Sequence, residues 1–363
     1  MMAVKKGKQT RKTSGQIKEE ILSHLKKGPL STKRLSDLLK SNWSTINAHL
    51  EELEREGNVR EIYSRENLKV YVRSDYPVFY GLPLDDKKLK DSLFLLSRII
   101  EKWREKKKQA INKTTMQKIA VNVARNNSLD IPVVRFHYGK VLTAYLEPGK
   151  YQETMRTYEI KEPPNSEFIE KAVEKEIEEG GHSNLAWMEK KNQYKAHEDM
   201  KIFDLSDRVF YIISKDRDDR TNELLNIFSN ILLFIPTSER YSYLFEKYHE
   251  FVRAVYFIFN SKEFEKKEYK KGLLNEILDT FSSIWQALTT EFFFEDIEPA
   301  ISKEFEEIVD YIKDSKTKTY YFEIDNKLNN LLDYKTSLTI KETKLDETEE
   351  KMLNILLEGA DEE

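Results

Sequence analysis

Apolar residues recur at helical spacing in three short segments near the start of the chain, within residues 14–27, 31–40 and 43–57. The apolar positions are Ile17, Ile21 and Leu25 in the first segment, Leu35, Leu38 and Leu39 in the second, and Ile46, Leu50 and Leu53 in the third. Steps of three and four residues place each set on one face of a helix. The pattern therefore predicts three short amphipathic helices.

Polar residues and a glycine mark where these helices begin and end. Ser14 can cap the first helix and Ser31 the second, because a hydroxyl oxygen accepts hydrogen bonds from N–H groups of the first turn. Gly57 follows the third helix, where a chain often turns into the left-handed conformation. Residues 58–63 and 69–74 are rich in β-formers and flank a polar loop. That arrangement predicts a β-hairpin.

Three short helices followed by a hairpin resemble the winged helix-turn-helix of ArsR-type and MarR-type DNA-binding regulators. The resemblance rests on the stretch LSDLLKSNWSTINAHLEELEREGNV and the basic hairpin after it, and it covers residues 14–75. It implies a domain that binds double-stranded DNA sequence-specifically, most simply as part of a prokaryotic transcription regulator.

The resemblance also implies which side chains meet DNA. The start of the third helix would face the major groove, where an Asn amide can pair with adenine through its donor and its acceptor. Cations of the second helix and of the wing would lie near phosphates or a narrow minor groove. The implied contact residues are Lys33, Ser44, Thr45, Asn47, Ala48, Arg60, Arg65, Lys69 and Arg73.

One feature leaves a second interpretation open. Glu51, Glu52, Glu54 and Glu56 make the later part of the third helix acidic, so only its first turns can approach phosphates. A winged helix can also bind protein, because one fold hosts many functions. The alternative is therefore an interaction protein or antitoxin-like scaffold whose winged helix docks on protein.

Charge is distributed unevenly along the chain. Residues 1–75 contain 16 Lys and Arg against 10 Asp and Glu, a net charge of +6, whereas the rest contains 44 against 54, a net charge of −10. A basic head on an acidic body is typical of a DNA-binding domain joined to a body that does not bind DNA. Residues 1–13 hold five cations and no acid. We expect a disordered basic tail there, which either adds phosphate contacts or is simply solvated.

The stretch 76–165 contains a linker, a long helix and a small mixed unit. The linker reads YPVFYGLP and ends where Asp85 or Asp86 can cap the long helix. The apolar residues of that helix form a seam that predicts a homodimer. The seam consists of Leu89, Leu93, Leu96, Ile100 and Trp103.

A helix at 114–127 and a hairpin around Gly139 and Lys140 follow. The order TMQKIA, then IP, then HYG resembles the Panacea domain of antitoxin-like proteins over residues 114–146. That domain has a proline where this chain has Lys140.

From residue 166 to residue 345 the spacing of apolar residues predicts a multi-helix domain, with separate helices at 298–316 and 322–335. Such a domain can dimerise, sense an effector in its core or bind a protein partner. Residues 346–363 form an acidic tail. The predicted fold class is mainly α (α+β): a winged helix, a small mixed α/β unit and a C-terminal helical domain.

Composition narrows the chemistry. The chain has 363 residues and no Cys, which excludes disulfides, thiolate metal sites and Cys nucleophiles. We find no phosphate-binding glycine loop, no standard metal motif and no membrane segment or secretory signal. We therefore expect a cytoplasmic protein that is not an enzyme and needs no cofactor or metal.

Overall fold

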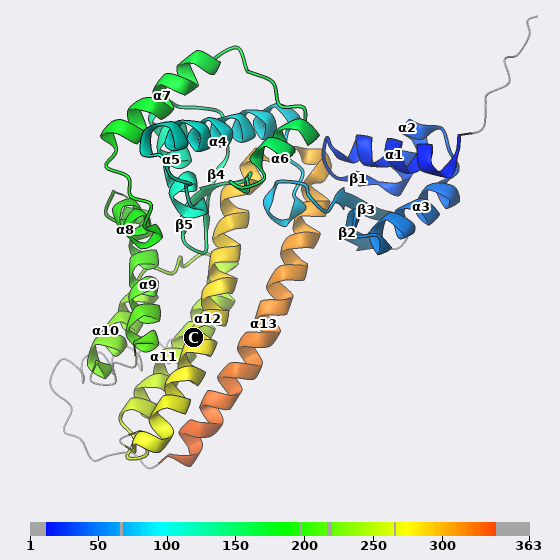
Figure 1. Cartoon of the computed structure of the whole chain (residues 1–363). Helices are drawn as coiled ribbons and strands as arrows, with labels where there is room; N and C mark the ends of the chain where they lie inside the picture. Colours follow the sequence, from blue (N-terminus) through cyan, green and yellow to red (C-terminus); the bar gives the residue numbers. More distant parts are fainter. Residues whose placement is uncertain (1–11, 66–67, 197, 216–219, 265, 339–363) are drawn as a thin grey trace, which may run out of the picture. The chain divides into compact units, whose positions relative to one another are not determined.

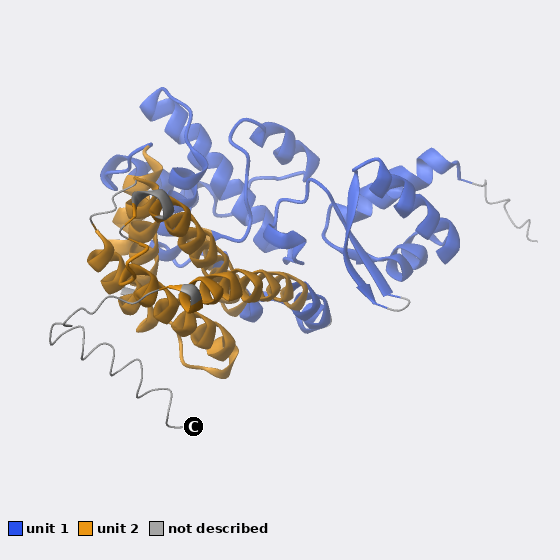
Figure 2. Cartoon of the chain, turned by 90° about the horizontal axis from the view of Figure 1, so that it is seen from below, with its two compact units in different colours: residues 1–133, 142–184, 297–312 blue, residues 134–141, 185–296, 313–363 orange. Residues whose placement is uncertain are grey.

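A computed structural model describes residues 12–65, 68–196, 198–215, 220–264 and 266–338. The described chain is mainly helical with two small sheets, which confirms the predicted fold class. It divides into two compact units, which Figure 2 shows in two colours. Unit 1 comprises residues 1–133, 142–184 and 297–312, and unit 2 comprises residues 134–141, 185–296 and 313–363. Residues 66 and 67 at the tip of the predicted hairpin lie outside the described residues. Both predicted tails also lie outside them, except for Lys12 and Thr13.

The elements of unit 1 are labelled in Figure 1. Its helices are α1 (Ser14–Leu25), α2 (Thr32–Leu39), α3 (Trp43–Arg55), α4 (Asp86–Lys107), α5 (Lys113–Asn126), α6 (Tyr151–Thr157) and α7 (Ser166–Glu179). Its strands are β1 (Leu30–Ser31), β2 (Val59–Arg65) and β3 (Leu68–Arg73). A hairpin of β4 (Val133–Phe136) and β5 (Gly139–Leu142) follows α5.

The later part of the chain, from Ala186 onward, is mainly helical in its described residues. Its helices are α8 (Ala186–Ala196), α9 (Lys201–Ser214), α10 (Thr221–Leu232), α11 (Ser242–Phe259), α12 (Lys267–Ile297) and α13 (Glu306–Ser337). Short 3₁₀ turns separate several of them, for example Glu239–Tyr241 before α11. Among the residues that the structure describes, no helix has both the length and the apolar character needed to cross a membrane.

Residues 12–75, here called the head, fold around the three predicted apolar stripes. All members of those stripes except Ile17 and Leu38 are buried in one core, which Val59 and Tyr71 of the hairpin complete. The strands pair antiparallel in the order β1-β3-β2, with a bulge between Glu61 and Tyr63. The predicted helices and hairpin are thus confirmed. The two-residue strand β1 was not predicted, because two residues show no periodicity.

The C-terminal end of α3 is explained by local chemistry. Gly57 has φ +74. The N–H of Asn58 bonds the carbonyl of Leu53 at 2.8 Å, and the N–H of Gly57 bonds that of Glu54 at 2.9 Å. This pair of bonds is a Schellman motif, which needs the left-handed residue that Gly supplies without strain. At the other end the side chain of Asn42 makes no cap hydrogen bond.

Two details of the head differ from the sequence prediction. Thr13, and not Ser14, caps α1: its hydroxyl accepts from the N–H of Gln16, and the Gln16 side chain accepts from the N–H of Thr13. This reciprocal capping box satisfies two N–H groups, whereas Ser14 would satisfy one. Leu38 is 40% exposed although it lies at the end of an apolar stripe.

The apolar seam of α4 lies inside unit 1. All five of its residues are buried by the chain itself, chiefly against α5 and α7. The prediction of a dimer through this seam is therefore wrong, because a buried face cannot meet a second copy. The packing of α7 also places residues 166–184 in unit 1, although we predicted them as part of the later helical domain.

Gln117 connects α5 to the chain after the β4–β5 hairpin. Its side-chain oxygen accepts from the N–H of Leu142 at 2.9 Å, and its amide donates to the carbonyl of Ala144 at 3.1 Å. Gln117 and Lys118 are both buried. Gln117 of the Gln-Lys pair that carried the second resemblance thus joins α5 to residues 142–144 of unit 1.

Unit 2 has a core rich in aromatic rings, to which α9, α10, α11, α12 and α13 all contribute. Figure 1 shows α12 and α13 side by side, and Lys327 of α13 donates to the hydroxyl of Ser283 on α12 at 2.8 Å. α13 runs unbroken from Glu306 to Ser337. The predicted break between residues 316 and 322 is wrong, since no Gly or Pro interrupts the segment. The sequence prediction also missed α6, and it gave no separate bounds for α8 and α9 within the predicted helical domain.

Candidate nucleic-acid interface

The start of α3 presents small and polar side chains to solvent. Ser44 and Ala48 are exposed on the side opposite the core residues, and Thr45 is half-buried between these two faces. Trp43, the first residue of the helix, is 45% exposed. The side chains of Ser44, Thr45 and Ala48 are short and uncharged, so the groove of a nucleic acid can approach the helix backbone closely.

The side chain of Asn47 is not oriented for its predicted role. Its amide donates to the Glu51 carboxylate one turn later at 2.7 Å, and its side-chain oxygen is buried without a partner. An adenine contact needs the amide and the oxygen to point outward together. The observed orientation presents neither, so the paired contact with adenine is not preformed.

The three acids of α3 and Glu56, its C-cap, all have partners within the head. Lys18 of α1 pairs with Glu52 at 3.1 Å and with Glu56 at 2.7 Å. Hydrogen bonds from Lys18 lower the pKa of both carboxyls. Glu51 accepts from Asn47, and Glu54 accepts from the N–H of Glu61 at 3.0 Å. Glu52, Glu54 and Glu56 thus hold α3 to α1 and β2, whereas Glu51 is bonded only within α3 and keeps its negative charge.

Two predicted wing cations stay at the surface. Arg65 ends β2 with an exposed side chain whose contact to Glu307 measures 4.0 Å, a loose pair in water. Lys69 pairs with Glu61 at 3.3 Å across the hairpin. On α2, the predicted Lys33 is exposed, and so is Arg34. Arg34 was missed by the sequence prediction, although its place in the first turn of α2 beside Lys33 is a usable signal.

The other two wing cations turn inward. The Arg60 guanidinium lies over Gly81, so close that a Cβ on this glycine would come within 2.8 Å of it. Gly81 also has φ +71, so another side chain there would be strained. Arg73 donates two bonds of 2.7 Å to Asp75, and Tyr158 donates to the same carboxyl at 3.2 Å. Burial alone would raise the pKa of Asp75, but these bonds outweigh it and lower that pKa. In this conformation Arg60 and Arg73 are turned toward other groups of unit 1, and their contact with DNA stays a prediction.

The wing also contacts another segment of this chain, the start of α13. The hydroxyl of Tyr63 on β2 donates to Glu307 at 2.7 Å, and its ring centroid lies 4.5 Å from that of Tyr311. Tyr63 is fully buried as a result. The first turns of α13 thus cover one face of the wing within unit 1.

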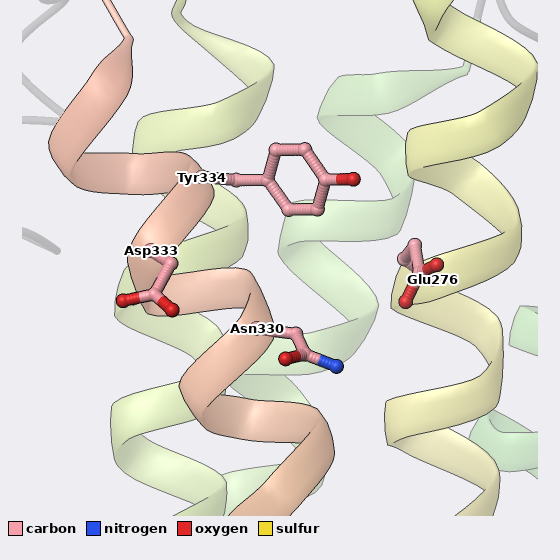
Figure 3. Close-up of a pocket in the computed structure, with 4 residues that line it drawn as sticks. All are labelled: Glu276, Asn330, Asp333 and Tyr334. Carbon is pink, nitrogen blue, oxygen red and sulfur yellow. The ribbon is translucent and has the colours of Figure 1, made fainter.

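Within the residues that the structure describes, no three His, Asp or Glu side chains gather closely enough to hold a metal ion. Figure 3 shows a shallow pocket of about 380 Å³ lined by Glu276, Asn330, Asp333 and Tyr334, in which Asn330 and Tyr334 point toward α12 and Asp333 points away. Two carboxylates that do not converge cannot share a proton or a metal ion.

No protein-family model, no curated protein and no solved structure matches this chain.

Proposed function

We propose that the head binds double-stranded DNA, with the start of α3 in the major groove and the wing beside the phosphate backbone. The order α1-β1-α2-α3-β2-β3 is that of a winged helix, and it agrees with the resemblance to ArsR-type and MarR-type regulators. One observation carries the proposal. The outward side of the first turns of α3 is small and uncharged, and Glu52, Glu54 and Glu56 beyond it are bonded to α1 and β2.

Cations near this surface support the same arrangement. Lys33 and Arg34 are exposed on α2, and Arg65 is exposed on the wing. Cationic side chains at a protein surface supply most non-specific DNA affinity through released counterions. Sequence-specific binding and a role in transcription regulation rest on the resemblance and on the groove-facing residues Ser44, Thr45 and Ala48.

Ala48→Glu tests the placement of α3. A carboxylate at this exposed position would meet the DNA backbone or base edges at close range, so we expect at least about tenfold weaker binding of a duplex by the full chain. Ser23→Glu is the matched control, because it adds the same charge to the exposed side of α1. Fluorescence anisotropy with a labelled duplex measures both variants. Equal weakening by the two variants would mean that α3 does not lie in a groove.

A protein-docking module is the second candidate, and the contact of Tyr63 with Glu307 and Tyr311 favours it. Exposed Trp43 and Leu38 add apolar surface near the start of α3. In this interpretation the head holds a protein in the manner of an antitoxin or scaffold. Ala48→Glu would then leave the weak, non-specific DNA affinity of the chain unchanged.

A further inference from the structure

Unit 2 contains a large cavity that the proposed function does not use. Its volume is about 910 Å³, and its walls come from the β4–β5 turn, α8, α9 and α12. Cavities of roughly 300–1,000 Å³ are the size that holds a small organic ligand. Five aromatic side chains contribute to the walls: Tyr138, Trp187, Phe210, Tyr211 and Trp285.

Three of these rings are unusually exposed. Tyr138 is 59% exposed, Trp187 56% and Tyr211 50%, and all three line the same cavity. A single exposed ring is ordinary, but a gathered set leaves much apolar surface in water. Flat aromatic walls favour a flat aromatic guest, because stacked and edge-on ring contacts add to the gain from burial.

His137 adds a polar acceptor to the cavity lining. Its Nδ1 lies 2.7 Å from the hydroxyl of Thr289, and that hydroxyl lies 2.8 Å from the carbonyl of Trp285. The carbonyl can only accept, so the single hydroxyl proton points to it and Nδ1 must donate. The other ring nitrogen, Nε2, then carries a lone pair. Burial lowers the pKa of His137 to about 4, which keeps the ring neutral at pH 7.

Lys191 gives the cavity a cation that has no ionic partner among the described residues. Lys190 pairs with Asp207 at 2.6 Å, and Arg208 of the lining pairs with Glu223 at 3.2 Å, so the charges of both pairs are balanced. Lys191 lies 5.6 Å from the ring centre of Trp187. Asp204 of the lining also has no cationic partner in the part of the chain that the structure describes. An anionic guest therefore finds Lys191 directly beside the aromatic wall.

We propose that this cavity binds a planar aromatic anion that also carries a hydrogen-bond donor. Its ring packs against the aromatic walls, its negative group lies at Lys191, and its donor reaches Nε2 of His137. The inference stands on unit 2 alone and does not depend on DNA binding by the head.

The probe for the test is 6-hydroxy-2-naphthoate, a planar anion with one hydroxyl donor, added to the full chain. Calorimetry and quenching of tryptophan fluorescence should both report saturable binding of one molecule per chain. 2-Naphthoate, which lacks the donor, should bind about fivefold more weakly, and the cation 2-naphthylmethylammonium should not saturate. Failure of the hydroxynaphthoate to saturate at millimolar concentration, or tighter binding of the cation, would overturn the proposal.

Variants locate the binding. Trp187→Ala and Lys191→Gln change exposed side chains, and each should weaken the hydroxynaphthoate about fivefold or more. Lys195→Gln is the matched control, one turn further along α8 and outside the cavity lining. His137→Phe should abolish the preference for the hydroxyl without abolishing binding. Equal weakening by Lys191→Gln and Lys195→Gln would show that the probe binds by overall charge and not in this cavity.

Discussion

Replacing Leu50 by Ala is expected to lower the free energy of unfolding of the head by about 2–5 kcal/mol, the range measured for truncating a buried Leu. Leu50 is fully buried, and it lies in one core with residues from all three helices and both long strands. The truncation removes three carbon atoms from the packed core, and the surrounding helices close only part of the void. The head should therefore open locally while unit 2 keeps its stability.

Hydrogen exchange of the intact chain measures this effect by region. Amides of α1, α2 and α3 should exchange faster in Leu50→Ala, while amides of α11 and α12 should not change. Leu38→Ala is the control, since it removes the same atoms from a side chain that is 40% exposed. We expect it to cost less than about 1 kcal/mol. If the two variants accelerate exchange equally, the head does not have the core described above.

The contrast between Leu50 and Leu38 shows what sequence can predict here. The head was predictable because each helix has its own apolar period and Gly57 marks a turn that needs a left-handed residue. Periodicity places a residue on a face, but it does not say where that face ends. Leu38 lies at such an edge, and only the packing of α2 decides its exposure.

Side-chain partners were much harder to predict than elements. Arg60 and Arg73 look like wing cations in the sequence. In the fold, however, Gly81 leaves room for the Arg60 guanidinium, and Asp75 pairs with Arg73. Asn47 was predicted to face DNA, but Glu51 one turn later accepts its amide proton. Two of these partners lie within four residues along the chain, but a pattern of residue types does not say which conformation each side chain adopts. The approach of Arg60 to Gly81 depends on the fold itself.

Acidification from pH 6.5 to pH 4 is expected to remove up to about 3 kcal/mol of stability from unit 2 through His137 alone. Burial lowers the pKa of this imidazole from 6.5 to about 4 in the folded chain. Between these two values the unfolded chain binds a proton that the folded chain does not, so stability falls as the pH falls. Above pH 6.5 and below pH 4 the two states bind equally, and the contribution is constant.

His137→Gln isolates this contribution, because Gln keeps a hydrogen-bonding side chain but does not titrate. Urea unfolding of both proteins at several pH values gives the difference in stability between them. All other titrating groups are shared, so the difference should move in favour of the variant as the pH falls from 6.5 to 4. A difference that stays constant across this range would mean that His137 is not held neutral by its surroundings.

The dependence of DNA binding on salt tests the central claim most directly. The full chain should bind a duplex of random sequence at low salt, and the logarithm of its affinity should fall linearly with the logarithm of salt concentration, by about 0.9 per phosphate contact. Arg65→Ala should reduce that slope by about one contact, whereas Arg73→Ala should leave it unchanged because Arg73 is bound to Asp75. No binding at low salt, or an equal loss of slope in both variants, would contradict a head that places its wing on the DNA backbone.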